Sequence, residues 1–501
     1  MKQTFALIRF DLLMQLRERG TWLLLAASLL LAGYGLLEGQ RFERHSLAAR
    51  AGAVQHEQTA RQEASTLAVR YFAAPDAPEF AGLQWFRTPV DIRGYAFREH
   101  VGYAVKPPVA GAALAIGQGD LLPGYVRVRG ESMESVRTAA EIEHPGRLAA
   151  GRYDLLFFII YLWPLILLPL CISVLTQERE SRRLRSLQLQ GVAPTRVLLA
   201  QTGARALAAT LLLLLFCTGA ALVTGAVPFT ASGAAALLHW SLVVLAYSAF
   251  WAALAMALCA LCASRMSAAF AAFGGWLVFT IVIPGLLAAG VQWGAPMPNR
   301  EYYVQAMRDA GDQVAADRLN SLARFYDSHP EWKPAATPLD KVSTSVSRLL
   351  RAQELERAMA GVEHTFETAR ARRDALFDHA ALFSPVTLGY QALSALAGND
   401  SARHQQFVQE VRQHQLKLRD FFQHAIQTAA LADEKSACAK TCADGYGFSN
   451  FAAVPRFAGS DALAQAPAIP GQFGVLLGWI VLLVAAAWWG VAYIARSRST
   501  L

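Results

Sequence analysis

The sequence predicts a mainly α-helical, polytopic membrane protein with six transmembrane helices and two large insertions outside the membrane. The chain has 501 residues, of which 54% are hydrophobic and only 17% are charged, whereas a soluble domain carries about 25% charged residues. The apolar residues gather in long runs separated by long polar stretches, a pattern typical of membrane segments joined to folded domains. This composition excludes a largely disordered chain, a collagen-like chain and a disulfide framework.

Six apolar runs are long enough to cross a hydrocarbon layer of about 30 Å as α-helices. They cover residues 21–37, 155–176, 206–227, 237–262, 267–291 and 473–494. Pro164, Pro169 and Pro284 lie inside these runs. We expect neighbouring helices to satisfy the backbone groups that each proline leaves unpaired.

Basic residues on the short flanks set the orientation. They are Lys2, Arg9, Arg17, Arg19, Arg179, Arg182, Arg183, Arg185, Arg196, Arg265, Arg496 and Arg498. The opposite short flank, residues 225–233, has no basic residue. The positive-inside rule therefore predicts a bacterial inner-membrane protein with both termini cytoplasmic, including a tail at 495–501, and with residues 38–154 and 292–472 in the periplasm. The alternative is that the first run is a cleaved signal peptide; it is disfavoured because a polar stretch with Asp11 and Glu18 precedes the run.

Residues 1–20 predict a helix that lies in the cytoplasmic membrane interface. Phe5, Ile8, Leu12 and Leu16 recur at spacings of three and four, and polar residues such as Asp11 lie largely elsewhere around the helix. The alternative is a plain cytoplasmic extension of the first span.

The two outside regions differ in pattern. The first opens with a polar, helix-favouring stretch at 41–72, which can continue the first span outward. Short alternating runs such as 124–130 then predict a small mixed α/β module. The second region has apolar residues at helical spacing over 348–383 and 401–432, so we expect it to be mostly helical.

The sequence contains no signature of a catalytic centre. It has no phosphate-binding loop, no HExxH motif and no G-x-S-x-G nucleophile elbow, so we expect no enzymatic activity and no directly bound cofactor. His404, His414 and His424 lie ten residues apart, so successive side chains are about 80° apart around a helix and do not converge on a metal. The net charge of +8 comes without a basic stripe interleaved with aromatic residues, and we expect no nucleic-acid partner.

The cysteines divide by predicted compartment. Cys171, Cys217, Cys259 and Cys262 fall within spans and are expected to pack as small apolar residues. Cys438 and Cys442 lie in the second outside region, where an oxidising periplasm favours a disulfide that pins a local turn. A two-cysteine metal site is the alternative, but no nearby histidine or third cysteine completes it.

The segment 177–205 joins the second and third spans on the cytoplasmic side. Its predicted partner-docking residues are Glu178, Arg179, Glu180, Arg182, Arg183, Leu184 and Leu187. A charged turn followed by leucines three residues apart is typical of a short amphipathic helix that docks on a partner. The alternative is a solvated loop that simply follows the positive-inside rule.

Three stretches resemble a known family. Residues 106–128, 151–180 and 382–408, together with the span pattern, resemble type-2 ABC exporter permeases with a large extracytoplasmic domain of unknown function. Such permeases are often labelled as involved in multi-copper enzyme maturation. The discriminating pieces are the Gly117–Asp120 run up to Pro123, and Ser384–Pro385 through Gly398–Asp400. After Glu180 the family usually continues with a Gly-Thr-Leu-like turn, whereas this chain has Ser181 followed by Arg182.

The resemblance implies a transmembrane permease subunit, of exporter or mechanotransmission type. It implies a separate cytoplasmic ATP-binding subunit that holds ATP and Mg²⁺, and a second permease in a homodimer or a pair with a sister chain. Membrane lipid and a periplasmic protein are further candidate partners. The alternative function is a non-transporting membrane scaffold or sensor whose periplasmic domains bind a partner protein.

Overall fold

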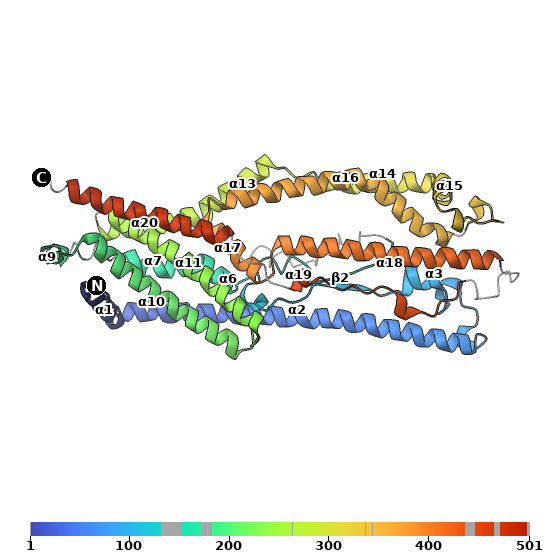
Figure 1. The fold of residues 1–501 in the computed structure, drawn as a ribbon, viewed down its shortest axis with the longest axis horizontal. Coiled ribbons are helices and arrows are strands. Elements are labelled where there is room, and N and C mark those ends of the chain that lie inside the picture. Colours follow the sequence, from blue (N-terminus) through green and yellow to red (C-terminus); the bar gives the residue numbers. More distant parts are fainter. Residues whose placement is uncertain are drawn as a thin grey trace.

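One helix, α2 (Arg19–Ala73), runs along most of the molecule in the computed structural model (Figure 1). Its 55 residues form one unbroken helix, about 82 Å long at the usual rise. The first part of α2 belongs to a membrane bundle, and the second part belongs to an extramembrane domain. The structure describes residues 2–131, 152–172, 174, 178, 183–262, 264–335, 337–342, 344–435, 446–464 and 471–497.

The protein is a mainly α-helical, multi-pass membrane protein, which confirms the predicted fold class. Among the described residues, six helices are long and apolar enough to cross a membrane. The first is α2, and the second is formed by α6 (Leu155–Phe157), η5 (Phe158–Leu162) and α7 (Trp163–Ile172). The others are α10 (Pro194–Val223), α11 (Ala231–Leu261), α12–η6–α13 (Arg265–Leu277, Val278–Val282, Ile283–Gly294) and α20 (Gly471–Ser497).

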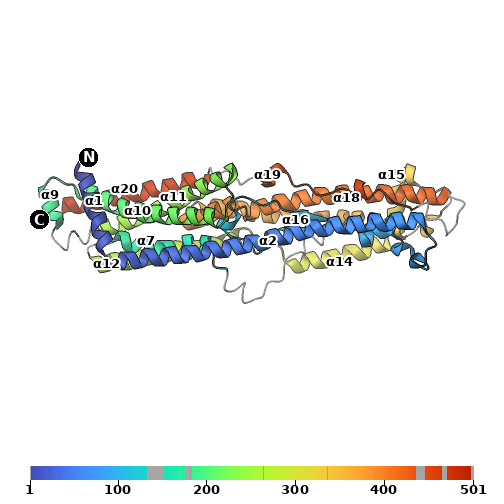
Figure 2. The ribbon, with the colours of Figure 1, turned by 90° about the horizontal axis from the view of Figure 1, so that it is seen from below.

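Both ends of the chain lie at the same end of the bundle, which we call the terminal end (Figures 1 and 2). Here α1 (Lys2–Arg17) turns away from α2 at Glu18, whose backbone is extended and interrupts the helix. The short helix α9 (Arg183–Leu189) also lies at this end, between the second and third spans. An even number of spans requires this common location.

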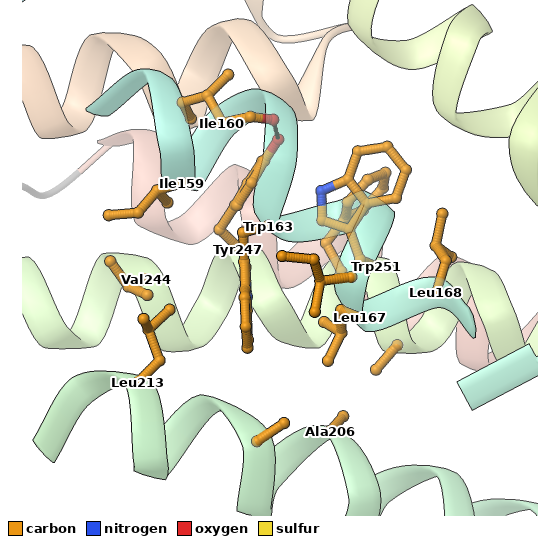
Figure 3. Packing of buried hydrophobic residues seen from close by; sticks show 14 of the residues in the cluster. Ile159, Ile160, Trp163, Leu167, Leu168, Ala206, Leu213, Val244, Tyr247 and Trp251 are labelled. Atoms are coloured by element: carbon orange, nitrogen blue, oxygen red, sulfur yellow. Dashed lines mark hydrogen bonds between the residues drawn. The ribbon is translucent and has the colours of Figure 1, made fainter. Parts of the chain in front are cut away.

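Helix α11 is the centre of the bundle. Trp163 of the second span and Tyr247 and Trp251 of α11 are fully buried between neighbouring helices (Figure 3). In a membrane such contacts stabilise by van der Waals packing and interhelical hydrogen bonds, because lipid is as apolar as the side chains. The indole of Trp163 supplies one such bond by donating to the hydroxyl of Ser248 at 2.9 Å.

The π-helical turn η5 shows how the bundle accommodates a proline. Pro164 has no N–H, so the carbonyl of Ile160, four residues earlier, lacks its helical donor. The hydroxyl of Tyr247 on α11 donates to that carbonyl at 2.8 Å (Figure 3). The indole of Trp276 on α12 likewise donates to the carbonyl of Tyr161 at 3.0 Å. The expectation that neighbouring helices satisfy the freed backbone is confirmed at Pro164.

The extramembrane domain is a set of long helices roughly parallel to α2 (Figures 1 and 2). The long ones are α14 (Arg300–Ala316), α16 (Thr344–Ala381) and α18 (Ser401–Lys435). The shorter α15 (Arg318–Ser328) lies between α14 and α16 in the chain, and α17 (Pro385–Leu396) packs against the core of the bundle. Phe407, Val411, Leu418 and Phe422 form the buried face of α18, at spacings of four and seven residues that keep them on one helix face. They belong to a hydrophobic core separate from that of the bundle.

The first outside region contributes a small antiparallel pair, β1 (Tyr103–Val105) and β2 (Tyr125–Arg127), in which Ala104 faces Val126. The predicted strand at 124–130 is thus present. Short turns complete the domain: η1 (Pro78–Phe80), η2 (Trp85–Arg87), α3 (Ile92–Gly94), η3 (Tyr95–Glu99), η4 (Ala112–Leu114), η7 (Pro330–Trp332), η8 (Leu339–Lys341), η9 (Phe451–Ala453) and α19 (Asp461–Ala464).

Cysteine labelling tests the orientation of this fold in the membrane. Gln58→Cys on α2 and Ala360→Cys on α16 should react with an impermeant maleimide in intact bacterial spheroplasts, because both positions are exposed in the extramembrane domain. Ser186→Cys on α9 should react only after permeabilisation, because the positive-inside rule predicts that the terminal end lies in the cytoplasm. Labelling of Ser186→Cys but not Gln58→Cys in intact spheroplasts would show the opposite orientation.

Candidate functional site

The predicted docking segment lies at the terminal end, and its leucines face different surroundings. Leu184 is only 9% exposed and belongs to the core of the bundle. Leu187 is half-buried, whereas Leu189 at the end of α9 is 84% exposed. Leu184 and Leu187 therefore do not form one accessible face, because Leu184 packs into the bundle core. Leu189 is the leucine of α9 that is accessible at the surface.

The charged part of this segment is described only at its two ends. A guanidinium nitrogen of Arg183 lies 3.3 Å from a carboxylate oxygen of Glu178, so the two form an ion pair across the start of α9. Arg179, Glu180 and Arg182 lie outside the described residues, as do Cys438 and Cys442.

A buried ion pair ties α1 to the bundle beside this segment. The guanidinium of Arg205 on α10 donates two hydrogen bonds to the carboxylate of Asp11, at 2.7 and 2.6 Å, and a third to the carbonyl of Leu170 at 3.0 Å. Asp11 is 5% exposed and Arg205 is 9% exposed. A bidentate pair of this kind fixes orientation as well as distance. We call it the α1 clasp.

The α1 clasp corrects the expected position of Asp11, which is buried between helices rather than on a solvated polar face. The apolar residues of α1 are not all buried either, because Phe5, Phe10 and Leu16 are largely exposed and suit a helix in contact with lipid. Arg205, directly before the apolar run 206–227, was the sequence signal for a buried pair. Its partner could not be identified because it lies 194 positions away.

The other end of the bundle meets the extramembrane domain through the junction loop, which we define as residues 106–124. The loop lies close against α2: a Cβ on Gly39 would overlap the carbonyl oxygen of Ala113. The loop also binds the start of the second span, because a carboxylate oxygen of Asp154 accepts from the N–H of Ile116 at 2.7 Å. The other oxygen of Asp154 caps α6 by accepting from the N–H of Phe157 at 2.7 Å.

The junction loop also binds the turn between α17 and α18. The side-chain amide of Asn399 donates to the carbonyl of Ala115 at 2.7 Å, and the N–H of Gln118 donates to the carbonyl of Asn399 at 3.2 Å. Gly117 has a φ of +54°, and a Cβ there would lie 2.9 Å from the hydroxyl of Ser394. Glycine is therefore required at this close approach. The three stretches that carry the family resemblance thus meet at one place.

Buried cations stabilise the far side of the junction loop. Arg403, in the first turn of α18, donates to the carbonyls of Gly398, Pro107 and Leu463 at 2.9, 2.6 and 3.1 Å. Burial lowers the pKa of Arg403 to about 10 and that of Lys106 to about 8. Such groups are tolerated in a protein interior when carbonyl or carboxylate oxygens surround them, so this corner of the junction is held in a defined geometry.

Comparison with known protein families gives a match for one part of the chain. A family described as a domain of unknown function, DUF3526, matches residues 300–436, which extend from α14 to the end of α18. No curated protein and no solved structure matches the chain. Within the described residues, no three His, Cys, Asp or Glu side chains are grouped so that they could hold a metal ion.

Disrupting the α1 clasp should destabilise the bundle. Arg205→Met leaves the Asp11 carboxylate buried without its partner, and we expect a loss of about 3 to 5 kcal/mol in the free energy of unfolding. The double variant Asp11→Leu/Arg205→Met removes both charges and should recover most of that loss. The free energies of unfolding of the single and the double variant can be measured by unfolding the purified chain in mixed micelles with increasing SDS. Additive losses in the double variant would contradict a direct pairing.

The contact between α2 and the junction loop can be tested with matched glycine substitutions. Gly39→Ala forces the junction loop away from α2 and should cost about 2 kcal/mol, the usual range for overpacking. Gly52→Ala, on the same helix but with no atom within 4 Å of the added Cβ, should stabilise α2 by about 0.5 to 1 kcal/mol. The difference in stability between the two variants can be measured by thermal unfolding and by the protease sensitivity of the junction loop. Equal effects of the two variants would argue against a close contact.

Proposed function

We propose that this chain is the transmembrane permease subunit of a bacterial ABC transporter of exporter or mechanotransmission type. In this proposal a separate cytoplasmic subunit binds and hydrolyses ATP with Mg²⁺, and the present chain passes the resulting motion to its periplasmic part. The chain itself carries out no catalytic step and holds no cofactor. It acts in the bacterial inner membrane with a second permease, either a second copy of itself or a sister chain.

The observation that carries this proposal is the continuity of α2. The helix begins beside the α1 clasp at the terminal end, passes the junction loop at Gly39 and ends in the extramembrane domain at Ala73. A helix without proline or another interruption transmits displacement along its axis, since every backbone hydrogen bond is retained. A movement imposed at the terminal end therefore reaches the extramembrane domain directly.

The packing of the bundle supports a mechanical role. Its core is filled by large side chains such as Trp163, Trp240 and Trp251, which are almost completely buried. Close-packed interiors transmit strain and do not deform continuously. The fifth span, α12–η6–α13, has most of its apolar surface outside this core. That surface is available to lipid or to the second permease.

Helix α9 is the proposed contact with the ATP-binding subunit. It is held to the bundle by Leu184 and projects Leu189 from the terminal end. An exposed leucine on a short helix can enter a groove of a partner, while Arg183 and Arg185 beside it add orientation through carboxylates at the rim. Glu178 pairs with Arg183 and links this contact to the end of the second span.

A cavity in the extramembrane domain favours the second candidate function, a membrane scaffold or sensor. It has a volume of about 400 Å³ and lies between α15 and α16, next to Phe97. Arg318, Arg348 and Arg351 line it together with Ser321. Guanidinium groups suit an anionic group of a periplasmic partner; that of Arg348 is already paired with the carboxylate of Glu131, which leaves Arg318 and Arg351 as the main candidates for such a contact. In this alternative the chain would function without an ATPase.

Substitution of the exposed leucine separates the two proposals. Leu189→Asp should leave the fold intact, because the side chain is 84% exposed, but it should weaken association with the ATPase. A lost apolar anchor of about 2 kcal/mol corresponds to roughly 30-fold weaker binding. The measurement is the amount of ATP-binding protein that copurifies from native membranes, identified by mass spectrometry.

The matched control is Leu319→Asp, which changes an exposed leucine of α15 in the extramembrane domain and should retain the ATPase. Leu184→Asp should instead lower the yield of folded protein, because Leu184 is buried in the bundle core. If the chain and both surface variants copurify with no ATP-binding protein, the scaffold function replaces the transporter function.

A further inference from the structure

A second cavity lies where the membrane bundle meets the extramembrane domain. Its volume is about 590 Å³, within the range of roughly 300 to 1,000 Å³ that small-ligand sites occupy. One wall is a face of α2 from Tyr34 to Ala49, and the opposite wall is the last part of the junction loop. Arg152 and Tyr153, just before the second span, close one side. We call this cavity the junction cavity.

Charges of both signs line the junction cavity and lie close together. The guanidinium of Arg41 lies 2.6 Å from the carboxylate of Glu38, and that of Arg152 lies 3.9 Å from the carboxylate of Asp120. Arg152 also stacks over the ring of Phe42, with its central carbon 5.2 Å from the ring centroid. A simple anion would be attracted by the two arginines but repelled by the two carboxylates. A zwitterion can satisfy both signs at once, because its own charges are a few bonds apart.

Two tyrosines line the junction cavity on the side that faces the membrane bundle, where we expect the membrane surface to lie. The rings of Tyr34 and Tyr153 are 5.5 Å apart, and the hydroxyl of Tyr153 donates to the carbonyl of Leu31 at 3.0 Å. Tyrosine is enriched at this level because its ring is apolar and its hydroxyl is polar. Aromatic faces also attract an ammonium group.

The face of α2 that lines the cavity continues into the membrane as an exposed apolar strip. Leu23 and Leu30 are largely exposed; Leu30 follows Leu23 after seven residues, and Tyr34 follows Leu30 after four. Residues at these spacings share one helix face. A lipid whose acyl chains lie along these leucines would therefore present its headgroup to Glu38, Arg41 and the rest of the cavity.

We propose that the junction cavity binds the headgroup of a zwitterionic phospholipid that carries a primary ammonium and a phosphate. The phosphate lies between Arg41 and Arg152, and the ammonium lies near Glu38, Asp120 and the two tyrosine rings. The acyl chains extend along the exposed leucines of α2. Because Asp120 belongs to the junction loop, an occupied cavity braces that loop against α2. This inference is independent of the ATP-binding partner.

Lipid binding can be measured by native mass spectrometry of the full chain purified in detergent. The probes are dioleoyl phosphatidylethanolamine, dioleoyl phosphatidylglycerol and soluble phosphoethanolamine. The chain should bind one phosphatidylethanolamine at lower concentration than phosphatidylglycerol. Arg152→Gln and Glu38→Gln should each weaken that first binding event about 10-fold, as expected for loss of one charged contact of about 1.4 kcal/mol. Arg373→Gln, a change at an exposed arginine of α16, should have no effect.

Each arm of the experiment has an outcome that overturns the proposal. Equal affinity for the two phospholipids would show that the cavity does not distinguish a zwitterion from an anion. Displacement of the lipid by soluble phosphoethanolamine at equal concentration would assign the cavity to a free solute rather than to a lipid. Unchanged binding in Glu38→Gln, whose side chain is partly exposed and can be replaced without loss of folding, would place the lipid elsewhere. None of these results depends on whether an ATPase copurifies.

Discussion

Hydrocarbon offers no hydrogen-bond partner to a backbone carbonyl, and this constraint determines how the bundle is assembled around the second span. Side chains from three other helices donate to carbonyls of that span: Tyr247 of α11, Trp276 of α12 and Arg205 of α10. The carbonyls of Ile160 and Tyr161, which accept two of these bonds, lie in the π-helical turn η5 shortly before Pro164. The proline is thus compatible with the membrane only when α11 and α12 pack against it. The freed carbonyls need the donors on α11 and α12, and these bonds in turn hold the two helices against the second span.

The second span links the α1 clasp at the terminal end with the junction loop at the other end of the bundle. Its first residue follows Asp154, which binds the junction loop, and its last turn includes Leu170, which accepts from Arg205 of the α1 clasp. Helix α2 lies alongside and touches the junction loop at Gly39. Two helices therefore connect the terminal end with the extramembrane domain. A change in the angle of α1 at the terminal end would act on both, since α1 is joined to α2 by the turn at Glu18 and, through Arg205 of the clasp, to Leu170 of the second span.

The junction combines hydrogen bonds with close backbone contacts, and this combination suits a region that must transmit movement without coming apart. Asn399 and Arg403 each bind backbone carbonyls of another segment, so the geometry of these contacts does not depend on a flexible side chain as acceptor. The junction cavity lies on the membrane side of this region. A lipid bound there would couple the composition of the membrane to the position of the junction loop, with no change in the bundle core.

The six spans, the helical character of the second outside region and the strand near Val126 could be predicted from the amino-acid sequence, because each depends on the composition and spacing of residues that are close in the chain. The partner of Arg205, the burial of Leu184 and the meeting of residues 106–128, 151–180 and 382–408 were decided by tertiary structure. Asp11 is a surface residue by helical spacing alone and becomes buried only because α1 folds back against α10. The junction cavity is also a product of tertiary structure, because its two main walls come from segments that are about 70 to 90 positions apart. Contacts over such separations leave no periodic signal in one sequence, since any of many polar residues could have supplied them.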